Sequence, residues 1–125
     1  MVNLWPGIPA NQLCRKHLNA AINEGLNLLI RHHMRKGHRI QGWVDNGCIE
    51  VGCICARIKE LIAEAKARGY EWSYELMMAD TALAASYQRD YALKRIPMSN
   101  PDAIAKNKEK LSGRCPECRK RMEIS

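Results

Sequence analysis

Glu24 lies at a regular spacing from a histidine and an arginine that could serve catalysis. His17, Glu24 and Arg31 recur every seven residues, which aligns their side chains on one flank of an α-helix. A carboxylate at the edge of a buried face can stabilise a cationic intermediate or assist proton transfer. The same spacing fits an ordinary solvated glutamate, because such side chains are seldom buried without a partner. His17 has two interpretations: an orienting partner of Glu24, or a core-edge histidine with its own hydrogen bond.

The cysteines allow a metal site but do not require one. The chain has six, and only Cys115 and Cys118 form a Cys-x-x-Cys pair. A structural zinc site needs four ligands, usually from two such pairs. Cys48, Cys53 and Cys55 would have to supply the others at irregular spacing, with a histidine as a further candidate ligand. We therefore favour buried or incidental thiols and predict neither metal nor cofactor, with Cys115 and Cys118 as the candidates for a metal-stabilised module.

The charge of the chain favours a polyanionic partner. Twenty lysines and arginines against 13 acidic residues give a formal net charge of +7, which favours nucleic acid first. Packed side by side, two helices could present one basic stripe to a duplex. The residues of that stripe would be Arg31, Arg35, Lys36, Arg39, Lys106, Lys110 and Arg114. Ordinary solvated faces are the alternative interpretation.

Two helices are predicted from apolar periodicity. The first covers residues 14–38, and Asn11 is a candidate for its N-terminal cap. Its apolar stripe consists of Leu18, Ile22, Leu26, Leu29 and Ile30. The second covers about residues 53–68 and ends at Gly69. Its apolar face consists of Ile54, Ile58, Leu61, Ile62 and Ala65. An ion pair between Glu64 and Arg68 would support it.

Local signals define the rest of the chain. Residues 2–9 are expected to pack across the core with Trp5 as their anchor. Residues 40–52 are expected to form a connector, and residues 73–95 are helix-prone. A last helix starts at Pro101 and closes at Gly113. We predict an all-α, single compact domain of three to four packed helices with long connectors over residues 1–125, including a basic tail over residues 113–125.

The sequence lacks targeting and membrane signals. It has no apolar run of about 18 residues that could span a membrane, and no signal peptide is visible at its start. A cytoplasmic protein is therefore expected.

Taken together, these residues resemble the pyrimidine-dimer DNA glycosylases with lyase activity, the endonuclease V-type excision enzymes of phages. Near the start, Asn3-Leu4, His17-Leu18, Ala20 and Glu24 are similar to that family's opening segment and first helix. Other similar segments are ELIAE (60–64), KARGY (66–70), QGWVDNG (41–47) and RCPECR (114–119). The order and spacing of these motifs carry the resemblance, which covers most of the chain.

The resemblance implies a DNA-repair enzyme of phage or bacterial origin, without metal or cofactor. The amine of the residue after the removed methionine, here Val2, would attack the sugar C1′, expel the base and form an imine. β-Elimination would then cleave the strand, with Glu24 stabilising the sugar intermediate. An α-amine has a pKa of about 8, so much of it is neutral near pH 7. The expected partner is damaged or modified double-stranded DNA, with no membrane and with a monomeric chain.

Some residues around this predicted site differ from the family pattern. Asn3, Asn23 and Asn27 stand where the family has arginines, and Val2 stands where it has threonine. His17, Asn3 and Asn23 are expected as supporting residues. The loss of cations motivates an alternative: a catalytically altered DNA- or protein-binding member of the same fold.

Overall fold

The described part of the chain is built of helices. The computed structural model describes residues 3–34, 41–46, 48–49, 53–71 and 101–124. These residues contain no strand, and the predicted all-α class is confirmed. The helices are η1 (Ala10–Gln12, 3₁₀), α1 (Arg15–Met34), α2 (Gln41–Asp45), α3 (Ile54–Ala67), α5 (Pro101–Arg114) and α6 (Pro116–Ile124). None of these helices is long and apolar enough to cross a membrane.

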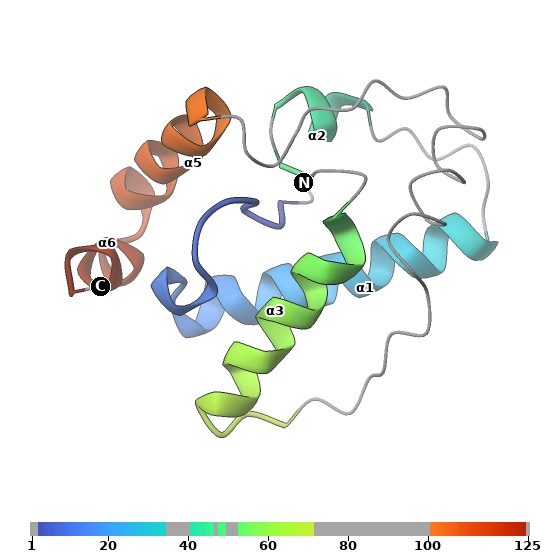
Figure 1. Ribbon diagram of the computed structural model, residues 1–125, viewed down its shortest axis with the longest axis horizontal. Coiled ribbons are helices and arrows are strands. Elements are labelled where there is room, and N and C mark those ends of the chain that lie inside the picture. Colours follow the sequence, from blue (N-terminus) through green and yellow to red (C-terminus); the bar gives the residue numbers. More distant parts are fainter. Residues whose placement is uncertain (1–2, 35–40, 47, 50–52, 72–100, 125) are drawn as a thin grey trace.

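The core forms where α1 packs on α3 (Figure 1). Leu18 and Ile22 of the predicted α1 stripe are fully buried and Leu26 is partly buried. Leu28 and Ala21 are buried as well, which sequence periodicity did not indicate. The side chains of the two other stripe residues, Leu29 and Ile30, lie outside the described part of the structure.

Helix α3 follows the sequence prediction closely. All five residues of its predicted apolar face are buried, and Glu64 pairs with Arg68 at 3.7 Å. The helix ends before Gly69, whose φ of +88° is accessible to glycine at little cost. The amide of Gly69 donates to the Lys66 carbonyl and that of Tyr70 to the Ala65 carbonyl, which satisfies carbonyls at the helix end.

Gly25 permits the close approach of three elements beside Glu24. A Cβ atom at this position would lie 2.7 Å from Cγ1 of Ile58 on α3 and 3.3 Å from Cδ2 of Leu4. A side chain on Gly25 would therefore have to displace the Ile58 side chain and would crowd that of Leu4. The absence of a side chain at Gly25 thus allows residues 3–9, called here the N-terminal segment, to lie close to the Glu24 turn of α1.

We expect Gly25→Ala to lower the free energy of unfolding by about 1–2 kcal/mol, because overpacking outweighs the better helix propensity of alanine. Gly113→Ala is the matched control, since no atom lies within 4 Å of its added Cβ. That control should be neutral or stabilise by up to about 1 kcal/mol. Urea unfolding of both variants measures the difference, and equal stabilities would contradict a tight contact at Gly25.

Several sequence predictions differ from the structure. The first helix is described from Arg15 to Met34, and residues 35–40 lie outside the described part. Asn11, the predicted N-terminal cap of the first helix, belongs to η1 instead. Cys14 is the residue that directly precedes α1. Trp5 is only partly buried, while Leu4 and Ile8 anchor the N-terminal segment. Residues 73–95 lie outside the described part.

The predicted connector and the predicted tail each contain a helix. Residues 41–45 form α2, because local helical turns satisfy backbone groups between two longer elements. The last predicted helix does not close at Gly113, which lies inside α5. A new helix, α6, then starts at Pro116, with Pro at its first position and Glu117 in its first turn. The tail prediction missed these two helix-start signals.

Candidate functional site

Glu24 contacts the start of the chain. Its side chain is half-buried on α1, and its Oε2 accepts a hydrogen bond from the backbone amide of Asn3 at 3.0 Å. The two residues are 21 positions apart in sequence. The carboxylate predicted as catalytic therefore faces the first described residue of the N-terminal segment. Val2, the predicted nucleophile, lies outside the described residues.

The N-terminal segment is held by backbone and side-chain hydrogen bonds. The Leu4 amide donates to the carbonyl of Cys48 at 2.8 Å. The Asn3 side chain accepts from the Trp5 amide through Oδ1 at 2.8 Å. Trp5 has a φ of +49°, a strained conformation for a residue with a side chain. Surrounding contacts have to hold this conformation in place.

Arg57 supplies those contacts from α3. Its Nε donates to the Leu4 carbonyl and its Nη2 to the Trp5 carbonyl, each at 2.8 Å. Its Nη1 pairs with Glu60 Oε2 at 2.9 Å. The side chain is only 3% exposed, and this burial lowers the pKa of Arg57, while Glu60 opposes the shift. The buried guanidinium remains charged and fixes two consecutive carbonyls.

Arg57 was missed by the sequence analysis, although a signal existed. It lies three residues after Ile54 and four before Leu61, on the apolar face of the helix. A cation in that register must find partners inside the fold. The sequence could not show that these partners are carbonyls of the N-terminal segment.

Asn3 leaves one buried donor without a partner. The residue is 4% exposed, and its Nδ2 makes no hydrogen bond within the described structure. Buried polar groups normally find partners, so such an exception is a candidate ligand contact. The side-chain amide of Asn3 thus has an unused donor close to the backbone amide of the same residue, which binds Glu24. The other predicted neighbour, Asn23, is exposed.

The predicted basic stripe is described only in its α5 half. Lys106 and Arg114 are exposed and Lys110 is partly buried, on one face of α5. Burial raises the pKa of the Cys48 thiol, and the charges of Lys110 and Glu24 act on it in opposite directions. Lys110 and Glu24 therefore lie within electrostatic range of the same thiol. The side chain of Arg31 lies outside the described part of the structure. Residues 35, 36 and 39 lie outside it entirely.

A second group of side chains lies at the start of α1. Cys14, His17, Cys115 and Cys118 bring their sulfur and nitrogen donor atoms within 4.8 Å of one another. His17 therefore does not orient Glu24 through a hydrogen bond. Its Nδ1 lies 3.1 Å from Cys14 Sγ and 3.5 Å from Cys118 Sγ. The core-edge interpretation of His17 fits this arrangement.

The cysteine that complements the Cys-x-x-Cys pair is not one of those proposed from the sequence, although a histidine was a candidate ligand. In place of Cys48, Cys53 and Cys55, the described structure brings Cys14 and His17 to this pair. The missed signal is a Cys-x-x-His spacing at a helix start, which mirrors Cys115-x-x-Cys118. We refer to these four residues as the Cys3His cluster.

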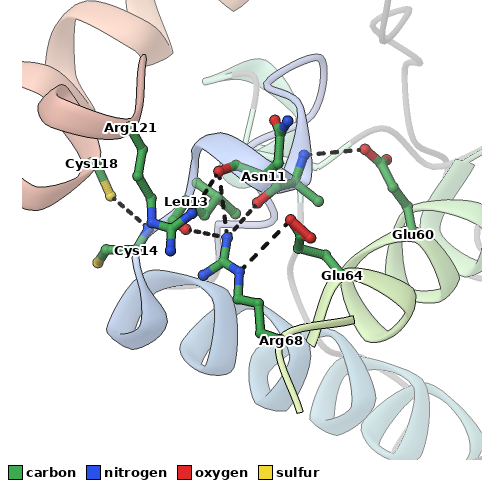
Figure 2. A network of polar contacts seen from close by, with 9 residues as sticks. Asn11, Leu13, Cys14, Glu60, Glu64, Arg68, Cys118 and Arg121 are labelled. Carbon is green, nitrogen blue, oxygen red and sulfur yellow. Dashed lines mark hydrogen bonds and ion pairs between the residues drawn. The ribbon is translucent and has the colours of Figure 1, made fainter. Parts of the chain in front are cut away.

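The backbone before α1 joins the cluster to the rest of the fold (Figure 2). The Cys14 amide donates to Cys118 Sγ at 3.2 Å. Arg68 of α3 donates to the Leu13 carbonyl at 2.7 Å, and Arg121 of α6 donates to the Asn11 carbonyl at 3.0 Å. The turn between η1 and α1 is thus fixed by side chains from both α3 and α6.

A pocket of about 560 Å³ lies elsewhere, at the junction of α6 and η1. Its lining residues are Asn11, Glu117, Lys120, Arg121 and Ile124. The lining includes neither Glu24 nor a cysteine, so the pocket does not form part of either group of functional side chains.

Comparisons of the chain with protein-family models, with curated proteins and with solved structures find no match. The functional proposal therefore depends on the geometry around Glu24 and on the sequence resemblance.

Proposed function

We propose that the protein is a DNA N-glycosylase with abasic-site lyase activity, with the α-amine of Val2 as nucleophile and Glu24 as catalytic carboxylate. The observation that carries the proposal is the 3.0 Å hydrogen bond from the Asn3 amide to Glu24 Oε2. Covalent bond lengths keep the nitrogens of two consecutive residues within about 4 Å of each other. An amine on the residue before Asn3 would therefore act beside this carboxylate.

The proposed reaction balances with these two groups. The neutral amine attacks C1′ of the deoxyribose as the bond from C1′ to the base breaks, and the base leaves with that electron pair and takes up a proton. The attacking nitrogen then gives up one proton, and the C1′–O4′ bond opens as O4′ takes up a proton, which leaves a protonated imine between the nitrogen and C1′. Loss of a proton from C2′ expels the 3′ phosphate by β-elimination, and water releases the enzyme.

Glu24 would have two roles in this sequence. Its negative charge stabilises the positive charge that develops on the sugar and on the protonated imine. Its oxygens can also accept and return protons at C2′ or O4′. The half-buried position strengthens the electrostatic part, because water screens a charge less at the edge of a core.

The direct test uses a duplex with a single abasic site and a matched undamaged duplex. We expect strand cleavage by β-elimination only at the abasic site. A UV-irradiated duplex and duplexes with single modified bases then identify the base that is released. Salt-sensitive DNA binding without cleavage would favour the alternative, a catalytically altered binding protein. The neutral, exposed side chains of Asn23 and Asn27 support this alternative, because they stand where the family has arginines.

The basic face of α5 gives a separate prediction about binding. Lys106→Ala should weaken binding to duplex DNA and reduce the slope of log K against log salt by about 0.9, the value for one lost phosphate contact. Lys108→Ala is the matched control, since this exposed lysine lies on another face of the same helix. Fluorescence anisotropy at several salt concentrations measures both slopes, and identical slopes would exclude Lys106 from the interface.

A further inference from the structure

We propose that the Cys3His cluster is a structural zinc site that joins the start of α1 to α6. The four donor atoms lie within 4.8 Å of one another, although the two halves of the cluster are about a hundred residues apart in sequence. This site is separate from Glu24 and does not depend on the glycosylase proposal.

Two distances between donor atoms match those of tetrahedral zinc, and the distance of 3.1 Å between Cys14 Sγ and His17 Nδ1 is shorter by about 0.4 Å. With Zn–S bonds of about 2.3 Å and Zn–N bonds of about 2.0 Å, the edges of the tetrahedron are about 3.8 Å for S–S and about 3.5 Å for S–N. The Cys14 and Cys115 sulfurs are 3.8 Å apart. Cys118 Sγ lies 3.5 Å from His17 Nδ1. The S–S separation also exceeds the disulfide bond length of about 2.05 Å, and all six cysteines are free.

The two halves of the cluster share one local structure. Cys14 directly precedes α1 and Cys115 directly precedes α6. In each half the third following amide donates to the first cysteine sulfur, from His17 at 3.5 Å and from Cys118 at 3.4 Å. The carbonyls of Cys14 and Cys115 accept the first helical hydrogen bonds. Two helix N-termini therefore converge, and their positive ends favour thiolates.

The chemistry of the donors favours zinc over harder cations. Cysteine thiolate and neutral imidazole are the usual ligands of structural zinc sites. The Cys118 sulfur belongs to a fully buried residue. A buried thiolate is costly by itself, and a divalent cation offsets that cost.

The arrangement indicates a structural rather than a catalytic ion. All four ligands come from the protein, which leaves no coordination position for a substrate. Cys14 is 2% exposed and Cys118 is fully buried. The ion would attach the short helix α6 to the turn before α1, in addition to the hydrogen bond from Arg121 to the Asn11 carbonyl.

The first test is the zinc content of the full chain, purified with a reductant and without added metal. Inductively coupled plasma mass spectrometry should find about one zinc ion per chain. Cys115→Ser should lose most of this zinc, whereas Cys53→Ser should retain it. Cys53 is the matched control because it is half-buried like Cys115 but lies outside the cluster. Chelation should lower the thermal midpoint of the wild type by at least about 10 °C.

A cobalt titration of the metal-free wild type does not depend on whether the Cys115 variant folds. We expect saturation at about one equivalent, with a sulfur-to-cobalt charge-transfer band and intense tetrahedral d–d bands. Two results would overturn the proposal. One is the absence of stoichiometric zinc together with the absence of these bands, and the other is a native disulfide between any two cysteines of the cluster.

Discussion

Glu24→Gln should reduce strand cleavage at an abasic site by about 10²–10⁴-fold. The substitution keeps the shape of the side chain, and the amide oxygen can still accept the hydrogen bond from the Asn3 amide. It removes the negative charge that would stabilise the cationic sugar and the imine. Single-turnover cleavage of an abasic duplex measures the effect on chemistry without product release.

Glu109→Gln provides the control for this prediction, because Glu109 is an exposed carboxylate on α5. It should cleave at the wild-type rate. Circular dichroism and urea unfolding should show that Glu24→Gln remains folded. A Glu24→Gln variant that cleaves within a few-fold of the wild type would remove Glu24 from the mechanism.

Arg57→Met should have the largest effect on stability, with a loss of about 2–4 kcal/mol in the free energy of unfolding. Methionine fills much of the volume but donates no hydrogen bond, so the carbonyls of Leu4 and Trp5 lose their charged donor. The strained Trp5 backbone would then relax. The Asn3 amide would move relative to Glu24, and cleavage should fall by up to about 10²-fold even in the folded protein.

Arg119→Met serves as the control, since Arg119 is exposed on α6, and it should change stability by less than about 0.5 kcal/mol. Arg57→Lys should recover part of the stability, because a lysine retains the charge but not the fork of donors. Unfolding by urea and cleavage well below the melting temperature separate the two effects. Wild-type stability in Arg57→Met would contradict the role of Arg57 in holding the N-terminal segment.

Local signals were sufficient for much of the fold. The buried face of α3, its end before Gly69 and the start of α5 at Pro101 follow from apolar periodicity and from backbone preferences that act within a few residues. Glu24 was selected in the same way, from its register on the first helix. The start of α6 at Pro116 has equally local signals, proline at the first position and Glu117 in the first turn, which the tail prediction did not include.

Long-range contacts were not accessible from the sequence. The Cys3His cluster joins positions near both ends of the chain, and two short motifs of different composition give no indication that they meet. The sequence analysis did not single out Arg57, because its partners are carbonyls of the N-terminal segment, more than 50 positions away in sequence. The need for glycine at position 25 likewise arises from contacts with Ile58 and Leu4, which are distant in sequence.

Borohydride trapping on an abasic-site duplex, followed by peptide mapping of the adduct, tests the proposed mechanism most directly. Reduction converts the imine into a stable amine bond between the protein and the sugar. The account predicts a covalent adduct in which the sugar is attached to the α-amine of Val2, in a protein whose intact mass shows the loss of Met1. Cleavage without any adduct, or an adduct on a lysine side chain such as that of Lys106 or Lys110, would contradict it.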